Sequence, residues 1–141
     1  SMRRLYSLYP SKSDLVAQWL EHRHETWTAG FHQRVERRLA KHDSAADAIF
    51  SALAEWMAET NFRGCGFINT HAEFAELTDA QRSIIRGHKR LLAEYLESVT
   101  PHGKALAVLV DGAIVQASIF ANTEPIELAR AAAALITQET P

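Results

Sequence analysis

The feature that most constrains this chain is an unbroken stretch of thirty residues, 11–40, that contains no proline and a single glycine. Apolar side chains recur along it at every fourth position, with Arg23 in the one place that is not apolar: Leu15, Trp19, Trp27, Phe31, Val35 and Leu39. This step predicts one long helix, which Pro10 separates from the preceding residues and which Ser11 or Ser13 caps. Four residues turn by about 400°, so the stripe rotates by about 40° per step and the two helix ends face different neighbours.

The rest of the chain repeats this pattern in shorter segments. Apolar residues at helical spacing predict further helices at about 44–57, 67–77, 79–99, 104–121 and from Pro125 onward. Six glycines and four prolines among 141 residues are too few for a turn-rich β fold. The sequence therefore predicts an all-α protein, a bundle of about six helices.

The composition narrows the class of protein further. Hydrophobic residues make up 47% and charged residues 23%, the balance of a soluble globular domain. One cysteine excludes an internal disulfide and fits a reducing cytoplasm. We expect no signal peptide and no membrane span, because the most apolar segment, 105–121, carries Asp111 and Gln116 and reads as a buried helix. Eight basic against four acidic residues in 1–41 favour an anionic partner near the N-terminus.

The last two predicted helices point to self-association. The helix at 104–121 is apolar on nearly every side, and one small bundle cannot cover all of them. The last helix carries five alanines between 129 and 134, which allow close helix approach, although alanine also simply favours helix formation. A second copy of the chain is the expected partner. We expect a homodimer whose interface is formed by Ala113, Ala117, Phe120, Leu128, Ala132 and Leu135.

Three segments resemble TetR-family transcriptional regulators. Residues 5–16 (LYSLYPSKSDLV) resemble the end of that family's DNA-binding domain and the start of the following helix. Residues 62–69 (FRGCGFIN) resemble a motif at the start of the family's sixth helix. Residues 109–113 (LVDGA) and the alanine-rich tail resemble its last two helices, which form the four-helix bundle of the dimer. The resemblance spans essentially the whole chain.

This resemblance implies a ligand-responsive transcriptional regulator, in most cases a repressor. Residues 1–10 would be the remnant of a helix-turn-helix domain, and 11–141 the ligand-binding and dimerisation domain. Most of the DNA-binding domain is then missing, so operator DNA is expected as a partner of the intact protein alone. In that intact protein, Arg3, Arg4 and Lys12 are expected to contact phosphates, although a solvated helix end explains them equally well.

The inward stripes of several helices predict a mostly apolar effector site. Large aromatic side chains pack imperfectly, which leaves room for a guest, whereas a filled core is the plainer interpretation. We expect the effector to be a small apolar compound. His88 is either a ligand contact or a core histidine, and Cys65 is either a sensing thiol or a small buried apolar residue. Asp111, if buried, needs a partner, which is a cation, a polar network or the effector. The expected lining is Trp27, Phe31, Trp56, Phe67, His88, Leu92 and Val108, with Cys65, Asn69 and Asp111 as polar groups. A hydrogen bond to a neighbouring backbone carbonyl is an equally good interpretation of Asn69.

Two other functions remain open. A small helical hydrolase or metal oxidase would need a coherent catalytic set, but Glu21 and His24 supply half of a di-iron signature and the matching second half is absent. We therefore expect no enzyme activity, no metal and no cofactor. A helical dimerisation module without any ligand is the third interpretation.

Overall fold

The computed structural model describes residues 11–59 and 62–138. These residues form six α-helices and no strand, which confirms the prediction of an all-α fold with about six helices. The proposed DNA-binding remnant at 1–10, with Arg3 and Arg4, lies outside the described residues. Lys12, the third predicted phosphate contact, is the first residue of helix α2.

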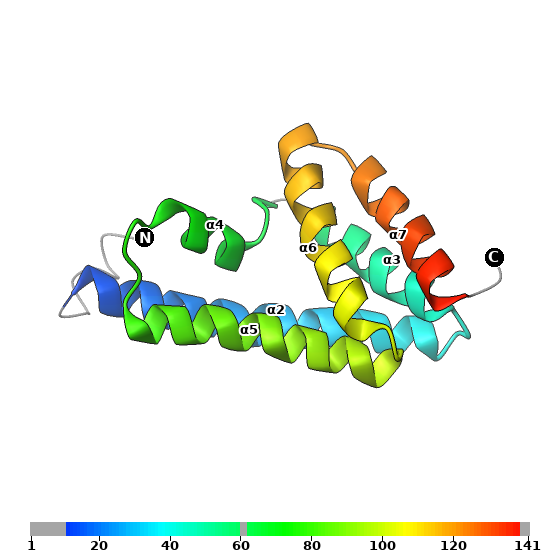
Figure 1. The fold of residues 1–141 in the computed structure, drawn as a ribbon, viewed down its shortest axis with the longest axis horizontal. Coiled ribbons are helices and arrows are strands. Elements are labelled where there is room, and N and C mark those ends of the chain that lie inside the picture. The colour runs from blue at the N-terminus through cyan, green and yellow to red at the C-terminus, as the bar shows by residue number, and fades with distance from the viewer. Residues whose placement is uncertain (1–10, 60–61, 139–141) are drawn as a thin grey trace.

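Two long helices form the backbone of the fold. Helix α2 spans Lys12–Leu39, and the side chain of Ser11 caps it by accepting a hydrogen bond from the Asp14 amide. Helix α5 spans Asp79–Val99 and lies beside α2 along the long axis of the molecule (Figure 1). Thr78 and Gln81 form a reciprocal capping box at its start.

The shorter helices cover one side of this pair. Helix α3 (Ala45–Met57) begins after Ser44, whose side chain accepts from the Asp47 amide. Helix α4 (Gly66–Glu73) lies over the other half of α2 and α5 (Figure 1). It ends four residues before the predicted Leu77, because the chain turns extended at Phe74.

The last two helices pack on each other, and α7 also packs on α3 while α6 also packs on α5. Helix α6 spans Gly103–Phe120 and α7 spans Glu124–Thr137, with Pro125 in the first turn as predicted. Gly103 sits where α6 turns sharply away from α5. A Cβ atom there would lie 2.1 Å from the Glu97 backbone nitrogen, so this turn requires glycine.

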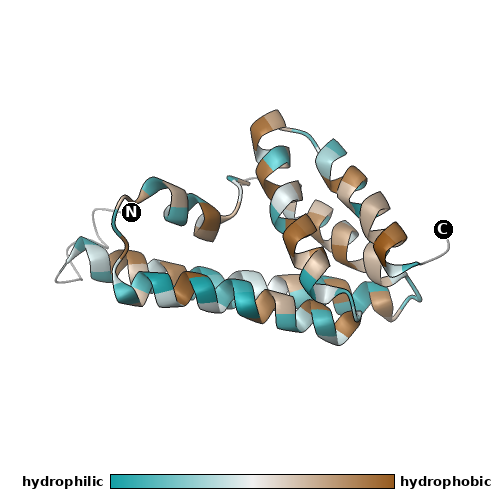
Figure 2. Ribbon diagram, in the orientation of Figure 1, coloured by the Kyte–Doolittle hydropathy of each residue, from teal (hydrophilic) through white to brown (hydrophobic). Residues whose placement is uncertain are grey.

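The core lies where α3, α6 and α7 meet α2 and α5. Its largest side chains are fully buried: Phe31, Phe50, Leu20, Ile49, Leu53, Leu96, Leu106 and Ile126. Each occupies an apolar position of its own helix, and hydrophilic and hydrophobic residues alternate along α2 and α5 (Figure 2). In the N-terminal half of α2, Leu20 is fully buried in this core, whereas its neighbour Trp19, from the predicted apolar stripe, is 41% exposed.

Helix α6 is only partly the buried helix that its composition predicts. Gly103–Phe120 is long and apolar enough to cross a membrane by length and composition, which is weak evidence for a span, and a third of its residues are buried. Its inner face, with Leu106 and Val110, is in the core. Its outer face is apolar and uncovered, with Val108 73% exposed and Ile119 70% exposed.

Candidate functional site

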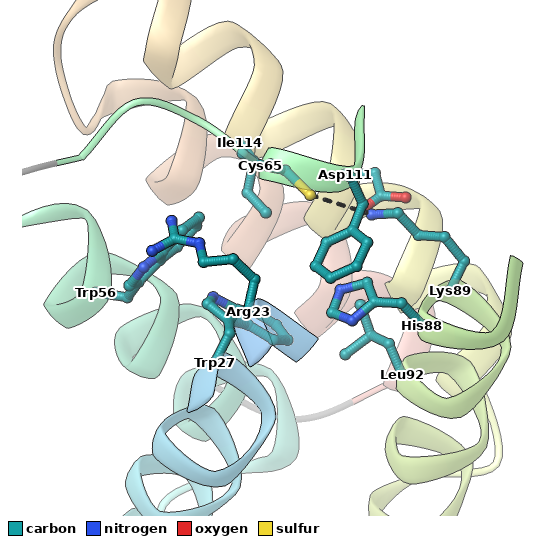
Figure 3. A pocket seen from close by; sticks show the side chains of 11 residues that line it. Arg23, Trp27, Trp56, Cys65, His88, Lys89, Leu92, Asp111 and Ile114 are labelled. Atoms are coloured by element: carbon teal, nitrogen blue, oxygen red, sulfur yellow. Dashed lines mark hydrogen bonds and ion pairs between the residues drawn. The ribbon is translucent and has the colours of Figure 1, made fainter. Parts of the chain in front are cut away.

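A pocket lies where α2, α4 and α5 meet α3 and α6. Figure 3 shows Arg23 and Trp56 on one side of it and Lys89, Asp111 and Cys65 on the other. Seven of the ten predicted effector-site residues line it: Trp27, Trp56, Cys65, Phe67, His88, Leu92 and Asp111. These seven residues come from five helices, α2 to α6, with Cys65 at the N-cap of α4, so side chains predicted to face inward do converge here.

Flat rings form the walls of the pocket. Trp27 meets the edge of Trp56 with ring centroids 5.7 Å apart and stacks on Phe31 at 4.8 Å. Phe67, from the first turn of α4, lies flat on the imidazole of His88, with centroids 3.7 Å apart and planes 5° from parallel. Such face-to-face surfaces suit another flat ring.

The prediction of a roomy cavity is wrong for this conformation. The free space inside the pocket measures about 10 Å³, room for about one water molecule. The cause is the stacking itself, because the ring of Phe67 occupies the face of His88 that a guest would use. Entry of any larger guest requires side chains to move.

A histidine pair joins α2 to α5 at the pocket floor. Nδ1 of His24 and Nδ1 of His88 are 2.8 Å apart, so one ring donates and the other accepts a single shared proton. His88 is 3% exposed. Burial, the nearby Lys89 charge and His24 together lower the pKa of His88 to about 3, so His88 is neutral at physiological pH.

Lys89 supplies the partner that Asp111 requires. Its Nζ lies 2.6 Å from Oδ1 of Asp111 and 3.6 Å from Sγ of Cys65. The pair ties α5 to α6 at the pocket rim, where both side chains are about one-third exposed. Asp111 is therefore compensated by a cation of the chain itself.

Three predicted lining residues lie elsewhere. Phe31 is buried behind Trp27 in the core. Asn69 donates from Nδ2 to the Arg63 carbonyl at 2.9 Å, a local bond that closes the loop before α4. Val108 is on the outer, exposed face of α6, so its placement in the pocket lining is wrong. The reason is that α6 is buried on one face only.

Sequence reasoning missed four lining residues: Arg23, Gly66, Lys89 and Ile114. Arg23 had a signal, since it replaces an apolar residue in the stripe of α2 one turn before Trp27. No sequence signal identified Lys89 as a lining residue, because it lies next to the inward His88 on a charged side of α5. Gly66 is present because a Cβ atom there would lie 2.9 Å from the ring of Trp19.

The predicted interface residues divide into two groups. Ala113 and Ala117 are 4% and 0% exposed within the single chain, so placing them in an interface between chains is wrong. They lie on the inner face of α6, which packs on α5 and α7. Phe120, Leu128 and Leu135 are more than 60% exposed, and Ala132 is partly buried.

Within the described part of the chain, no three histidine, cysteine or acidic side chains are close enough to hold a metal ion. His24, from the half-signature with Glu21, uses its Nδ1 for the bond to His88. The pocket therefore offers hydrogen bonds, charge and stacking surfaces as its means of recognition.

Comparisons with protein-family models, with curated proteins and with solved structures find no match. The resemblance of residues 62–69 and 109–113 to TetR-family regulators thus remains a prediction from those residues.

Proposed function

We propose that this chain is the effector-binding and dimerisation part of a ligand-responsive transcriptional regulator of the TetR type. The observation that carries the proposal is the distribution of exposed apolar residues. Nine large hydrophobic side chains are exposed among the described residues, and seven of them belong to α6 and α7. These seven are Val108, Val115, Ile119, Phe120, Leu128, Leu135 and Ile136.

Their spacing supports a helix-packing seam. Along α6, Val108, Val115 and Ile119 share one face with Gly112, where nothing lies within 4 Å of an added Cβ atom. Along α7, Leu128 and Leu135 are seven residues apart, which places them on one face as well. Two helices from each of two copies would bury both stripes in a four-helix bundle.

The pocket supports the effector part of the proposal. Helix α2 contributes Arg23 and Trp27 to the pocket and continues to Lys12, towards the end of the chain where the resemblance places the DNA-binding domain. A guest that binds one orientation of α2 better than another shifts the population of the two. In the intact dimer, that shift would change the separation of the DNA-binding domains, which must match half-sites about 34–36 Å apart.

Sedimentation of the wild-type chain at micromolar concentration tests the dimer. We expect about twice 15.8 kDa, and we expect Val115→Glu or Leu128→Glu to give monomers, because a charge in an apolar seam has no partner. Leu91→Glu is the matched control, since Leu91 is 46% exposed on α5, away from this face. A wild-type chain that stays monomeric would contradict the proposal. A monomeric chain that pellets with lipid vesicles would contradict it as well.

A dimerisation module without a ligand is the second candidate, and the filled pocket favours it. The two candidates differ in one measurement. A regulator gains thermal stability from a compound that binds the pocket, about 2.7 kcal/mol at one hundred times the dissociation constant. A module without a ligand gains none, and Trp56→Ala then lowers its stability without changing any response to compounds.

A further inference from the structure

Arg23 is the charged side chain of the pocket that has no acidic partner. Among the described residues, no carboxylate lies within ion-pair distance of it, and its guanidinium carbon is 5.8 Å from the ring centre of Trp19. The other cation of the pocket, Lys89, is neutralised by Asp111 at 2.6 Å. With His88 neutral, the pocket carries an excess of one positive charge.

His88 offers a second polar group to a guest. Its Nδ1 is used by His24, and its Nε2 has no hydrogen-bond partner among the described residues. Every fully buried side-chain nitrogen or oxygen described in the chain does have a partner, so Nε2 is not fully enclosed, and His88 is one of the residues that line the pocket. The side chain as a whole is 97% buried, since 3% is exposed. A buried imidazole with an unused nitrogen is a site for a polar substituent.

The stack of Phe67 on His88 indicates the shape of the guest. The phenyl ring fills the one flat apolar slot beside the imidazole. Helix α4, which carries Phe67, is eight residues long, has no side-chain cap and follows Gly64 in a left-handed conformation at φ 80°. Phe67 and Thr70 are its buried residues, so the ring of Phe67 is a principal contact between this short helix and the rest of the fold.

Resting on the proposed effector site, we propose that the guest is a small flat aromatic carboxylate. Its ring takes the place of the Phe67 ring on His88, and its carboxylate pairs with Arg23. Arginine suits this role because its planar fork binds a carboxylate with two hydrogen bonds. The excess positive charge disfavours an amine, and a neutral amide would leave Arg23 without a counter-ion in the closed pocket.

Calorimetric titration of the whole chain with 1-naphthoate, 1-naphthamide and 1-naphthylmethylamine tests the charge preference. We expect the acid to bind at least about tenfold more tightly than the amide, because hydrogen bonds to a charged group contribute about 1.5–3 kcal/mol. Arg23→Gln should remove that advantage and leave the amide unchanged. Arg86→Gln removes the same charge from an exposed position of α5 and is the matched control.

Phe67→Ala tests whether the guest displaces the phenyl ring of Phe67 from His88. Phe67→Leu is used instead if the alanine variant does not fold. Emptying the slot should tighten binding of the acid, since the phenyl ring no longer has to leave. Phe50→Ala empties a core position outside the pocket and should leave binding of the acid, and its dependence on Arg23, as in the wild type.

The results separate this inference from the proposed function. If acid and amide bind equally, or if Arg23→Gln changes neither, the carboxylate inference is overturned and the effector site stands. If the acid binds Phe67→Ala but not the wild type, the Arg23 pairing stands and the displacement is overturned. If no probe binds the wild type or Phe67→Ala, both the inference and the effector site are overturned.

Discussion

Nδ1 of His24 lies 2.8 Å from Nδ1 of His88, and this hydrogen bond joins the two longest helices of the molecule inside the pocket. One proton fits between the two rings. Binding of a second proton is unfavourable because His88 is buried. The same contact therefore controls both the shape of the pocket floor and the response of the fold to acid.

Stability should fall as the pH falls below about 6.5, the ordinary pKa of histidine. Because burial lowers the pKa of folded His88 to about 3, the unfolded chain binds a proton there that the folded chain does not, and acid favours unfolding. Between pH 6.5 and pH 5 this costs about 2 kcal/mol. Urea denaturation at pH 7 and pH 5 measures it.

His88→Phe should remove that part of the pH dependence. His22→Asn, at an exposed position of α2, should keep the wild-type slope. A His88→Phe variant that loses as much stability between pH 7 and pH 5 as the wild type would show that other groups cause the acid sensitivity.

Gly103→Ala should destabilise the fold by several kcal/mol, about as much as severe overpacking of a core. The added methyl group would lie 2.1 Å from backbone nitrogen of Glu97 and 2.3 Å from the carbonyl carbon of Leu96, and neither atom can move without shifting α5. Thermal or urea denaturation gives the change in the free energy of unfolding.

Gly87→Ala supplies the contrast to that variant. Nothing lies within 4 Å of an added Cβ atom at Gly87, in the middle of α5. Alanine is the better helix former, so this variant should gain about 0.5–1 kcal/mol. Equal effects at the two glycines would mean that close backbone approach does not govern the turn between α5 and α6.

Glu55 should contribute measurably to the packing of α3 on α2. It accepts from Nε and Nη2 of Arg38 at 3.0 and 2.6 Å and from Arg37 at 2.8 Å. Burial raises the pKa of Glu55, but the hydrogen bond and charge of Arg38, with the charges of Arg37 and Arg34, lower it further, so the net shift is downward. That contribution is present above the ordinary pKa of glutamate and is lost as the pH falls through the lowered value.

Glu55→Gln should therefore cost about 1 kcal/mol at pH 7, the upper end for a partly exposed pair. The difference from the wild type should shrink at pH 3 and in high salt. Glu73→Gln, at an exposed position of α4, is the control. An unchanged difference at pH 3 would assign the effect to packing instead of charge.

The helices could be predicted from the sequence because their signals are local. Spacing, caps and breaks within about four residues place the ends of α2, α3 and α5, as Ser11, Ser44 and Thr78 show. The end of α4 was misplaced because Phe74 and Leu77 continue the apolar pattern while the backbone has already turned extended.

Which residues meet across helices could be predicted only in part. Inward stripes bring Trp27, Trp56 and His88 together, since each is set by its own helix. The free space between them depends on ring orientations, and the stack of Phe67 on His88 leaves no sign in the sequence. The two faces of α6 could not be separated either, because alanine and valine occur on both, with Ala113 inward and Val108 outward.

Cys65 should report the opening of α4. It is the residue before the helix and is 7% exposed, so alkylation by iodoacetamide requires α4 to separate from α2 and α5. Phe67→Ala removes the ring that anchors α4 on His88, and the alkylation rate should rise by about tenfold or more, because a lost buried phenyl ring costs about 3–5 kcal/mol. His71→Ala, at an exposed position of the same helix, should leave the rate unchanged. Dividing the alkylation rate of each folded variant by the rate of the same variant unfolded in urea isolates the opening step. Equal rates for the wild type and Phe67→Ala would show that the Phe67 stack is not what holds α4 closed.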